Sequence, residues 1–206
     1  MAAIKKLILA LALLTGTCLG ASAQNNLAGM WASAHVNKVW NEHWYNSARF
    51  EYRMAAEETE CWFLMVGGGY SYKKFFRAEL DYEFWQVEPS TTFHKGVLAL
   101  TGSYRIDNWS FALREKYELS FNPESSPCDN NFRTKFTIGY KVPDSRFKPY
   151  MAYELFHFDK WRRMLYYCGT EINISKRSTF DIFYLLNYAK GGDFIHTVGL
   201  GYILNL

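Results

Sequence analysis

The sequence predicts an all-β fold in which antiparallel strands close into a transmembrane barrel of about ten strands. Three observations predict it: apolar and polar side chains alternate from Trp44 to the chain end, aromatic residues make up 18% of the chain, and tight connections alternate with longer ones. Successive side chains of a strand point to opposite faces, so this alternation indicates strands. After Gln24 no apolar run approaches the roughly 20 residues of a spanning helix, so a membrane crossing would require a closed barrel.

The first 23 residues resemble a secretory signal peptide. Lys5 and Lys6 precede the apolar stretch Leu7–Leu14, and Ala21-Ser22-Ala23 forms a small-x-small cleavage site. We expect cleavage after Ala23 and an exported protein. Two of the 23 basic residues lie in this leader, so the remainder nearly balances the 20 acidic residues and gives no electrostatic case for nucleic acid.

The next segment, residues 24–43, is harder to place. Leu27–Val39 alternates like a strand. Counting it as one full strand makes eleven and forces a parallel closure, which is rare. We therefore expect an accessory segment against or inside the barrel, or two short strands that bring the total to twelve, with the barrel itself formed by 44–206.

The remaining chain divides into ten expected strands with tight turns at one end. The longer connections, of which Asn122–Asn131 is the longest, fall at the other end. This is the outer-membrane pattern, with the longer loops outside the cell. The expected strands lie at about 43–54, 61–72, 75–87, 92–106, 108–121, 132–142, 147–158, 162–175, 178–190 and 194–205.

One face of these strands is charged, and we expect it to line the lumen. A soluble barrel would place rows such as Phe180, Ile182 and Tyr184 in water, which soluble surfaces rarely do. Mixed signs predict a paired network and a largely closed lumen, with a narrow small-solute pore as the alternative. The expected network comprises Arg49, Glu51, Arg53, Arg77, Glu79, Asp81, Glu83, Arg105, Arg114, Lys116, Glu118, Arg133, Lys135, Lys141, Lys148, Glu154, Glu171 and Asp181.

The opposite face carries Glu115 as its one clear mid-strand charge, which indicates a β-bulge near Arg114 or a local error in the expected register. Aromatic residues gather towards strand ends on this face and predict two interfacial girdles. The girdle residues are Trp44, Trp62, Tyr72, Trp109, Phe121, Phe132 and Phe147.

Candidate chemistry is sparse. His94, His157 and His196 fall near the outer strand ends on the apolar face, and His157 with Asp159 could supply the base and its orienting acid in an outer-membrane lipid hydrolase. No serine stands at a spacing that marks a nucleophile, so interfacial histidines beside aromatics explain the same positions. No spacing of Cys or His predicts a metal site or a cofactor. Cys61 and Cys128 could form a disulfide or remain unpaired thiols, and the sequence leaves both alternatives open.

The chain end, Gly201-Tyr202-Ile203-Leu204-Asn205-Leu206, resembles the carboxy-terminal assembly signal of outer-membrane barrels, carried by Gly201, Leu204 and Leu206. The whole exported chain also resembles the outer-membrane barrel family catalogued as domain-of-unknown-function family 2490. That resemblance implies a barrel in the outer membrane, in contact with its lipid and lipopolysaccharide and inserted by the barrel assembly machinery, and it brings no known active site. Its matching patterns are Trp31, Arg49-x-Glu51-x-Arg53, Gly69-Tyr70, Arg114-Glu115-Lys116 to Phe121, Phe132-Arg133 and Gly199-Leu200-Gly201-Tyr202.

Overall fold

A computed structural model describes residues 27–55, 60–87, 91–122, 125–158, 160–189 and 194–206. This part of the chain forms eleven strands and no helix, so it contains no helix that could cross a membrane. The strands are β1 (Leu27–Val39), β2 (Trp44–Ala55), β3 (Cys61–Tyr72), β4 (Phe76–Val87), β5 (Thr91–Ile106), β6 (Trp109–Asn122), β7 (Ser125–Tyr140), β8 (Phe147–Phe158), β9 (Lys160–Asn173), β10 (Ser178–Ala189) and β11 (Phe194–Asn205).

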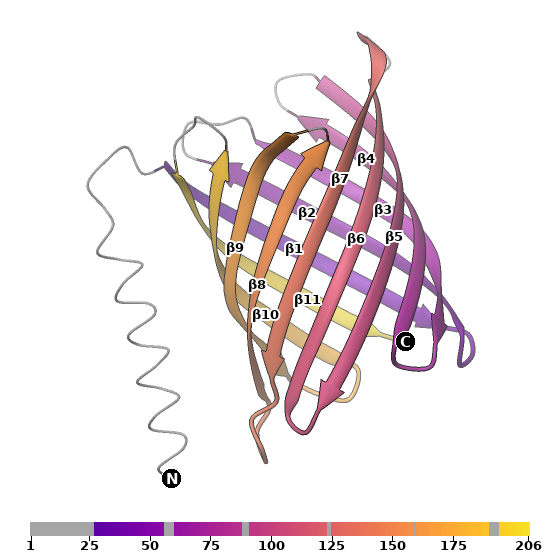
Figure 1. The fold of residues 1–206 in the computed structure, drawn as a ribbon, viewed down its shortest axis with the longest axis vertical. Coiled ribbons are helices and arrows are strands. Elements are labelled where there is room, and N and C mark those ends of the chain that lie inside the picture. The colour runs from indigo at the N-terminus through magenta and orange to yellow at the C-terminus, as the bar shows by residue number, and fades with distance from the viewer. Residues whose placement is uncertain (1–26, 56–59, 88–90, 123–124, 159, 190–193) are drawn as a thin grey trace.

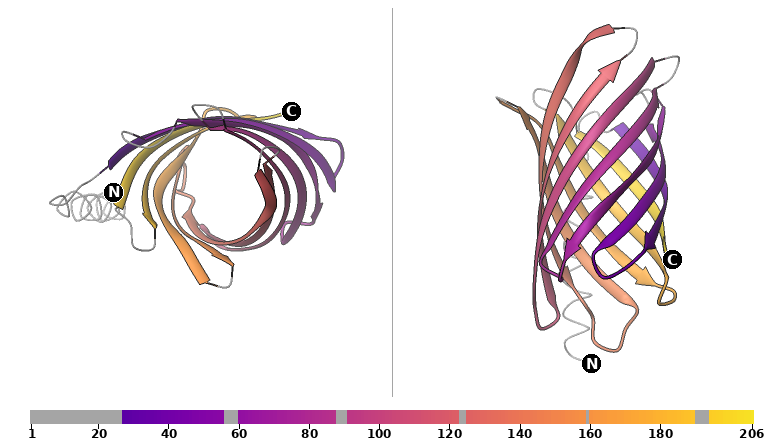
Figure 2. Two further views of the ribbon diagram at one scale, coloured as in Figure 1. Left: turned by 90° about the horizontal axis from the view of Figure 1, so that it is seen from above. Right: turned by 90° about the vertical axis from the view of Figure 1, so that its right-hand side faces the viewer.

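The strands close into one barrel, which confirms the predicted all-β barrel architecture (Figure 1). Consecutive strands pair antiparallel around the ring, and the view from above in Figure 2 shows that ring closing on itself. The expected count of ten strands, and the alternative of twelve, are both wrong. Eleven is odd, so the first and last strands run in the same direction and pair in parallel.

The residues expected as an accessory segment form β1, a full member of the barrel. β1 pairs with β2 from Gly29↔Ala55 to Val39↔Tyr45 and with β11 from Leu27↔Ile195 to Asn37↔Asn205. At the carboxy-terminal end the backbone N–H of Leu206 donates to the carbonyl of Asn37 at 2.8 Å, and the Asn37 amide donates to Asn205 Oδ1 at 3.0 Å. The parallel closure that the sequence argued against is therefore hydrogen-bonded along the whole of β1.

Most strand bounds agree with the predicted ones to within about two residues, and one connection does not. The long polar loop expected at Asn122–Asn131 is wrong, because β6 continues to Asn122 and β7 already begins at Ser125. This hairpin rises above the rest of the barrel in Figures 1 and 2. At the opposite end the turns are tight, and Lys73, Asp107 and Asp144 adopt positive φ values of 50–54° there.

Burial is reversed relative to a soluble protein. Apolar side chains of the outward rows are exposed, among them Leu80 at 68%, Leu200 at 50% and Ile182 at 44%. The carboxylates of Glu51 and Glu118, in contrast, are buried at 1% and 3% exposure. Six of the seven predicted girdle residues are exposed by 39–56%, and Trp62 is half-buried. The six are Trp44, Tyr72, Trp109, Phe121, Phe132 and Phe147.

Glycines on the inward face make room for the larger side chains of the interior. A Cβ atom on Gly199 would lie 2.0 Å from Cζ of the Phe183 ring, and one on Gly67 would lie 2.0 Å from Oδ1 of Asp81. Real Cβ atoms do not approach so closely. Phe183 and Asp81 can therefore occupy these positions only because residues 199 and 67 are glycines. The interior thus accommodates rings and carboxylates within a narrow cylinder.

Candidate functional site

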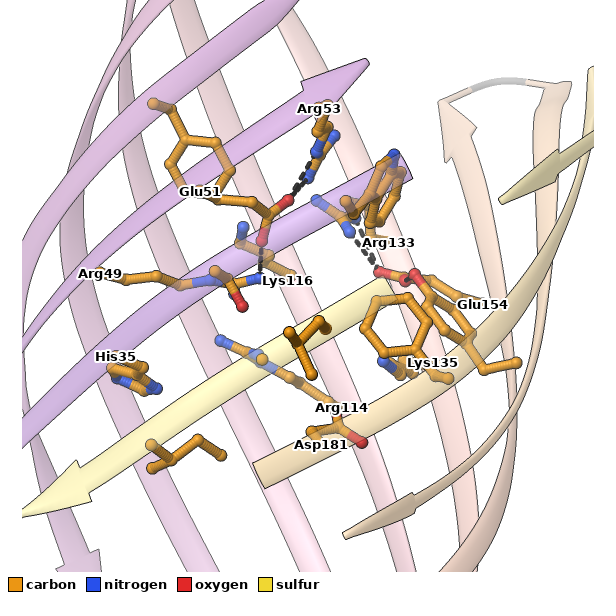
Figure 3. A pocket seen from close by; sticks show the side chains of 18 of the residues that line it. His35, Arg49, Glu51, Arg53, Arg114, Lys116, Arg133, Lys135, Glu154 and Asp181 are labelled. Carbon is orange, nitrogen blue, oxygen red and sulfur yellow. Dashed lines mark hydrogen bonds and ion pairs between the residues drawn. The ribbon is translucent and has the colours of Figure 1, made fainter. Parts of the chain in front are cut away.

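The barrel interior holds the candidate site, a cavity of about 240 Å³ surrounded by ion-paired side chains (Figure 3). The polar residues on its wall come from β1, β2, β4, β6, β7, β8, β9 and β10. Because every one of these strands alternates, each contributes polar side chains to the same interior space.

The first cluster lies along β2. Glu51 is clamped between Arg49 and Arg53, the residues two positions away on the same inward face. Arg53 Nε donates to Glu51 Oε1 at 2.6 Å. The Arg53 guanidinium also lies over the Trp31 ring, 4.0 Å from its centroid. Two cations and an aromatic face therefore offset the loss of hydration of one almost fully buried carboxylate.

The second cluster is a chain of alternating charges across four strands, Glu83–Lys116–Glu118–Arg133–Glu154. Lys116 Nζ lies 3.0 Å from Glu83 and 2.9 Å from Glu118, and Arg133 lies 2.7 Å from Glu118 and 2.6 Å from Glu154. Each interior member of the chain has an opposite charge on both sides.

Neutral donors complete the second cluster. The Trp85 indole N–H donates to Glu83 at 2.7 Å, and the Tyr167 hydroxyl donates to Glu154 at 2.9 Å. A buried charge needs hydrogen bonds as well as a counter-ion, because unsatisfied lone pairs are costly at low dielectric. Trp85 and Tyr167 were not among the predicted site residues. Strand alternation places both residues on the inward face, but it does not show which neutral side chain lies within hydrogen-bond distance of a charged group.

A third cluster surrounds Glu79, towards the end of the barrel with the tight turns. Arg114 lies 3.3 Å from its carboxylate, Arg77 lies 3.9 Å away, and the Tyr45 hydroxyl donates to it at 2.8 Å. A separate pair joins Lys148 to Glu171 at 2.9 Å.

Five residues of the predicted network lie outside these ion pairs among the described side chains. Asp181 accepts a hydrogen bond from the Tyr150 hydroxyl at 3.0 Å. Asp81 is buried beside Gly67, Arg105 is exposed at the end of β5, and Lys135 lies over the Tyr167 ring. Lys141 is exposed just after β7. The structure therefore brings most of the predicted charges together, and leaves five without an ion-pair partner in the described part of the chain. The five are Asp81, Arg105, Lys135, Lys141 and Asp181.

The outward histidines each meet a hydroxyl group. His94 contacts the Tyr82 hydroxyl, His196 contacts that of Tyr184, and His157 Nε2 lies 3.1 Å from Thr134 Oγ1.

The contact at His157 does not activate a nucleophile. The Thr134 hydroxyl donates a hydrogen bond to Glu115 at 2.8 Å. A nucleophile activated by His157 would have to direct this proton towards the His157 ring instead. Asp159, the expected orienting acid, lies outside the described residues. Glu115 itself faces outward in a regular ladder, opposite Thr134, so neither the bulge expected near Arg114 nor a register error occurs there.

Two further predictions concern the ends of strands. The Cys128 side chain lies outside the described part of the chain, so its disulfide with Cys61 stays a prediction. At the carboxy-terminus Gly201 is buried in the interior and Leu206 is half-exposed, and both lie on β11 or just beyond it, at the seam with β1. Their role in assembly, with Leu204, also stays a prediction.

Comparisons with known proteins agree with this architecture. The model of the family described as "Protein of unknown function (DUF2490)" matches residues 28–195, a range that contains all of the ion pairs above. A search of curated proteins finds no significant match. Among solved structures, one titled "KdgM porin" aligns with a TM-score of 0.50 and 12% identity, covering 75% of this chain and 81% of that one. At this identity the likeness shows a shared barrel fold.

Proposed function

This chain belongs to the DUF2490 family of proteins of unknown function, and from that premise we propose that it is an outer-membrane barrel whose lumen is closed by ion pairs and serves a structural or binding role. The protein is exported by a signal peptide cleaved after Ala23, and the barrel assembly machinery inserts it. Its outward rows then contact lipid and lipopolysaccharide.

The observation that carries this proposal is the reversed burial. Leu80, Leu98 and Val198 are 46–68% exposed, whereas Glu51, Glu83 and Glu154 are 1–4% exposed. In water such an exterior would be a continuous apolar surface and a liability for aggregation. In hydrocarbon it is the favourable arrangement, since lipid faces of barrels are apolar and their interiors polar.

A closed lumen is favoured over an open pore by what fills the cylinder. The charge chain from Glu83 to Glu154 spans β4 to β8, and the cavity beside it has about 240 Å³. At roughly 30 Å³ per water molecule, that volume holds about eight waters. Opening a path for larger solutes would require breaking several buried ion pairs at once, each of which is costly to separate.

Conductance in planar bilayers tests the closed lumen. We expect protein purified from membranes to insert without producing discrete current steps. Uniform, repeated steps from the wild-type protein would contradict the proposal, because a blocked cylinder carries no steady ion current.

A matched variant shows whether the assay can register an opened lumen. Replacing Arg133 and Glu154 together by alanine removes a cation and an anion, so the net charge is unchanged while the cavity grows. We expect small current steps from this double variant, provided that its migration on unheated gels shows it to be folded.

A further inference from the structure

Two buried nitrogen atoms on side chains that line the cavity have no hydrogen-bond partner among the described residues. These are Nε of Arg114 and Nε2 of His35, and both side chains line the cavity. Buried polar groups in native proteins are almost always satisfied, so such atoms indicate an interaction that the protein side chains alone do not supply. Arg114 has one described ion pair, through Nη2 to Glu79, and this leaves its Nε uncommitted.

A lysine without an ion pair shares the same wall. Lys135 lies over the Tyr167 ring, 4.0 Å from its centroid, and makes no ion pair among the described side chains. It is also the direct cross-strand partner of Arg114, in the ladder between β6 and β7. Like charges at directly opposed positions repel each other. On its other side Lys135 is opposed by Glu154, and that carboxylate is already ion-paired with Arg133.

The carboxylates on the cavity wall do not meet this need. Six Arg and Lys residues line the cavity against four Asp and Glu residues. Two further carboxylates outside the lining, Glu79 and Glu118, pair with Arg114, Lys116 and Arg133. Glu51, Glu83 and Glu154 are already held by Arg and Lys partners, and Asp181 accepts from Tyr150. Among the cations of the wall, Lys135 is therefore the one without an ion pair in the described part of the chain, and Arg114 keeps an unused Nε donor beside its pair with Glu79.

We propose that the cavity is a binding site for a small oxyanion, such as inorganic phosphate or a short carboxylate, held by Arg114 and His35 and attracted by Lys135. In the view of Figure 3 the Arg114 side chain lies between those of His35 and Lys135. A guanidinium presents fork-like donors that match phosphate and carboxylate oxygens. An imidazole Nε2 donates when it carries the proton. A cavity of about 240 Å³ accepts such an ion with a few waters.

Calorimetric titration with inorganic phosphate tests the site. The protein is purified from membranes in an uncharged maltoside detergent, so no lipid phosphate competes, and sodium chloride keeps the ionic strength constant. We expect one saturable site. Arg114→Gln and Lys135→Met should each weaken binding about tenfold, because each removes a charge-assisted contact.

Matched controls alter the same residue types in the tight turns. Arg146→Gln and Lys176→Met, both exposed in the structure, should leave phosphate binding unchanged. His35→Asn removes the imidazole donor without adding a charge, and it should also weaken phosphate binding. Absence of saturable binding to the wild-type protein, or equal binding to folded cavity and control variants, overturns the site.

This inference rests on the filled lumen of the proposed function, and the two can fail separately. A protein that is silent in bilayers and binds no phosphate keeps the closed lumen and overturns the site. A protein that conducts and still binds phosphate through Arg114 overturns the closed lumen and keeps the site.

Discussion

Replacing Arg133 by methionine is expected to lower the free energy of unfolding by about 3–5 kcal/mol, the range for removing one partner of a buried ion pair. Arg133 bridges Glu118 and Glu154 at 2.7 Å and 2.6 Å. Its loss leaves Glu118 with Lys116 and Glu154 with the Tyr167 hydroxyl, so both buried carboxylates become under-compensated. Urea unfolding of the protein in lipid vesicles, followed by tryptophan fluorescence, measures the change.

The same substitution at Lys135, two residues along β7, provides the matched control. Lys135 makes no described ion pair, so Lys135→Met in phosphate-free buffer should change the free energy of unfolding by no more than about 1 kcal/mol, roughly the worth of its cation–π contact. Equal losses at the two positions would contradict the assignment, since they would mean that charge pairing does not distinguish Arg133 from its neighbour.

Deleting β1, Leu27–Val39, is expected to abolish assembly of the folded barrel. β1 is hydrogen-bonded to β2 on one side and to β11 on the other. Without it both neighbours present unpaired N–H and C=O groups, each of which costs several kcal/mol in hydrocarbon. The readout is the faster migration of the folded form on unheated gels, which the deletion variant should lack.

A cross-link keeps this test independent of whether the shortened chain can fold. In a background without the native cysteines, Met30→Cys with Val198→Cys should form a disulfide, because these residues are direct partners at the parallel seam. Met30→Cys with Tyr202→Cys should not, since Tyr202 lies four residues, or about 13 Å, farther along β11. If the deletion variant assembles and the first pair does not cross-link, β1 is an accessory segment and the barrel closes with ten strands.

The faces of the strands were predictable from the sequence because alternation is a local property. The charges of Glu79, Glu83, Arg133 and Glu154 all follow from strand parity alone, and the structure places them in the interior. The identity of each ion pair was not predictable in the same way, because it depends on how strands tilt and pack around the ring.

Lys116 illustrates this limit. It lies on β6 and reaches Glu83 on β4, across the intervening strand β5. On β5, Ala99 is the ladder partner of Lys116, and Val97 is the next inward residue towards Glu83. These two are 0% and 1% exposed, and their small side chains leave the path between the two charges open. A sequence pattern identifies small inward residues, but only the closed barrel shows which charges they allow to meet.

The strand count failed for a different reason. The expectation of ten strands depended on the general preference for antiparallel closure, and the alternation in Leu27–Val39 was given less weight than that preference. His35, which lines the cavity, lies in this segment and was therefore missing from the predicted site. The long β6–β7 hairpin was missed because its polar residues do not alternate.

Spin labels along β10 determine which face of the strands meets hydrocarbon and which faces the interior. Single nitroxides at Phe180 and Ile182 should be relaxed strongly by oxygen, which partitions into hydrocarbon, and weakly by a water-soluble nickel chelate. Labels at Phe183 and Leu185 should respond weakly to both reagents, since these side chains face the packed interior. Strong relaxation of the Phe180 and Ile182 labels by the nickel chelate would place that row in water and contradict the account.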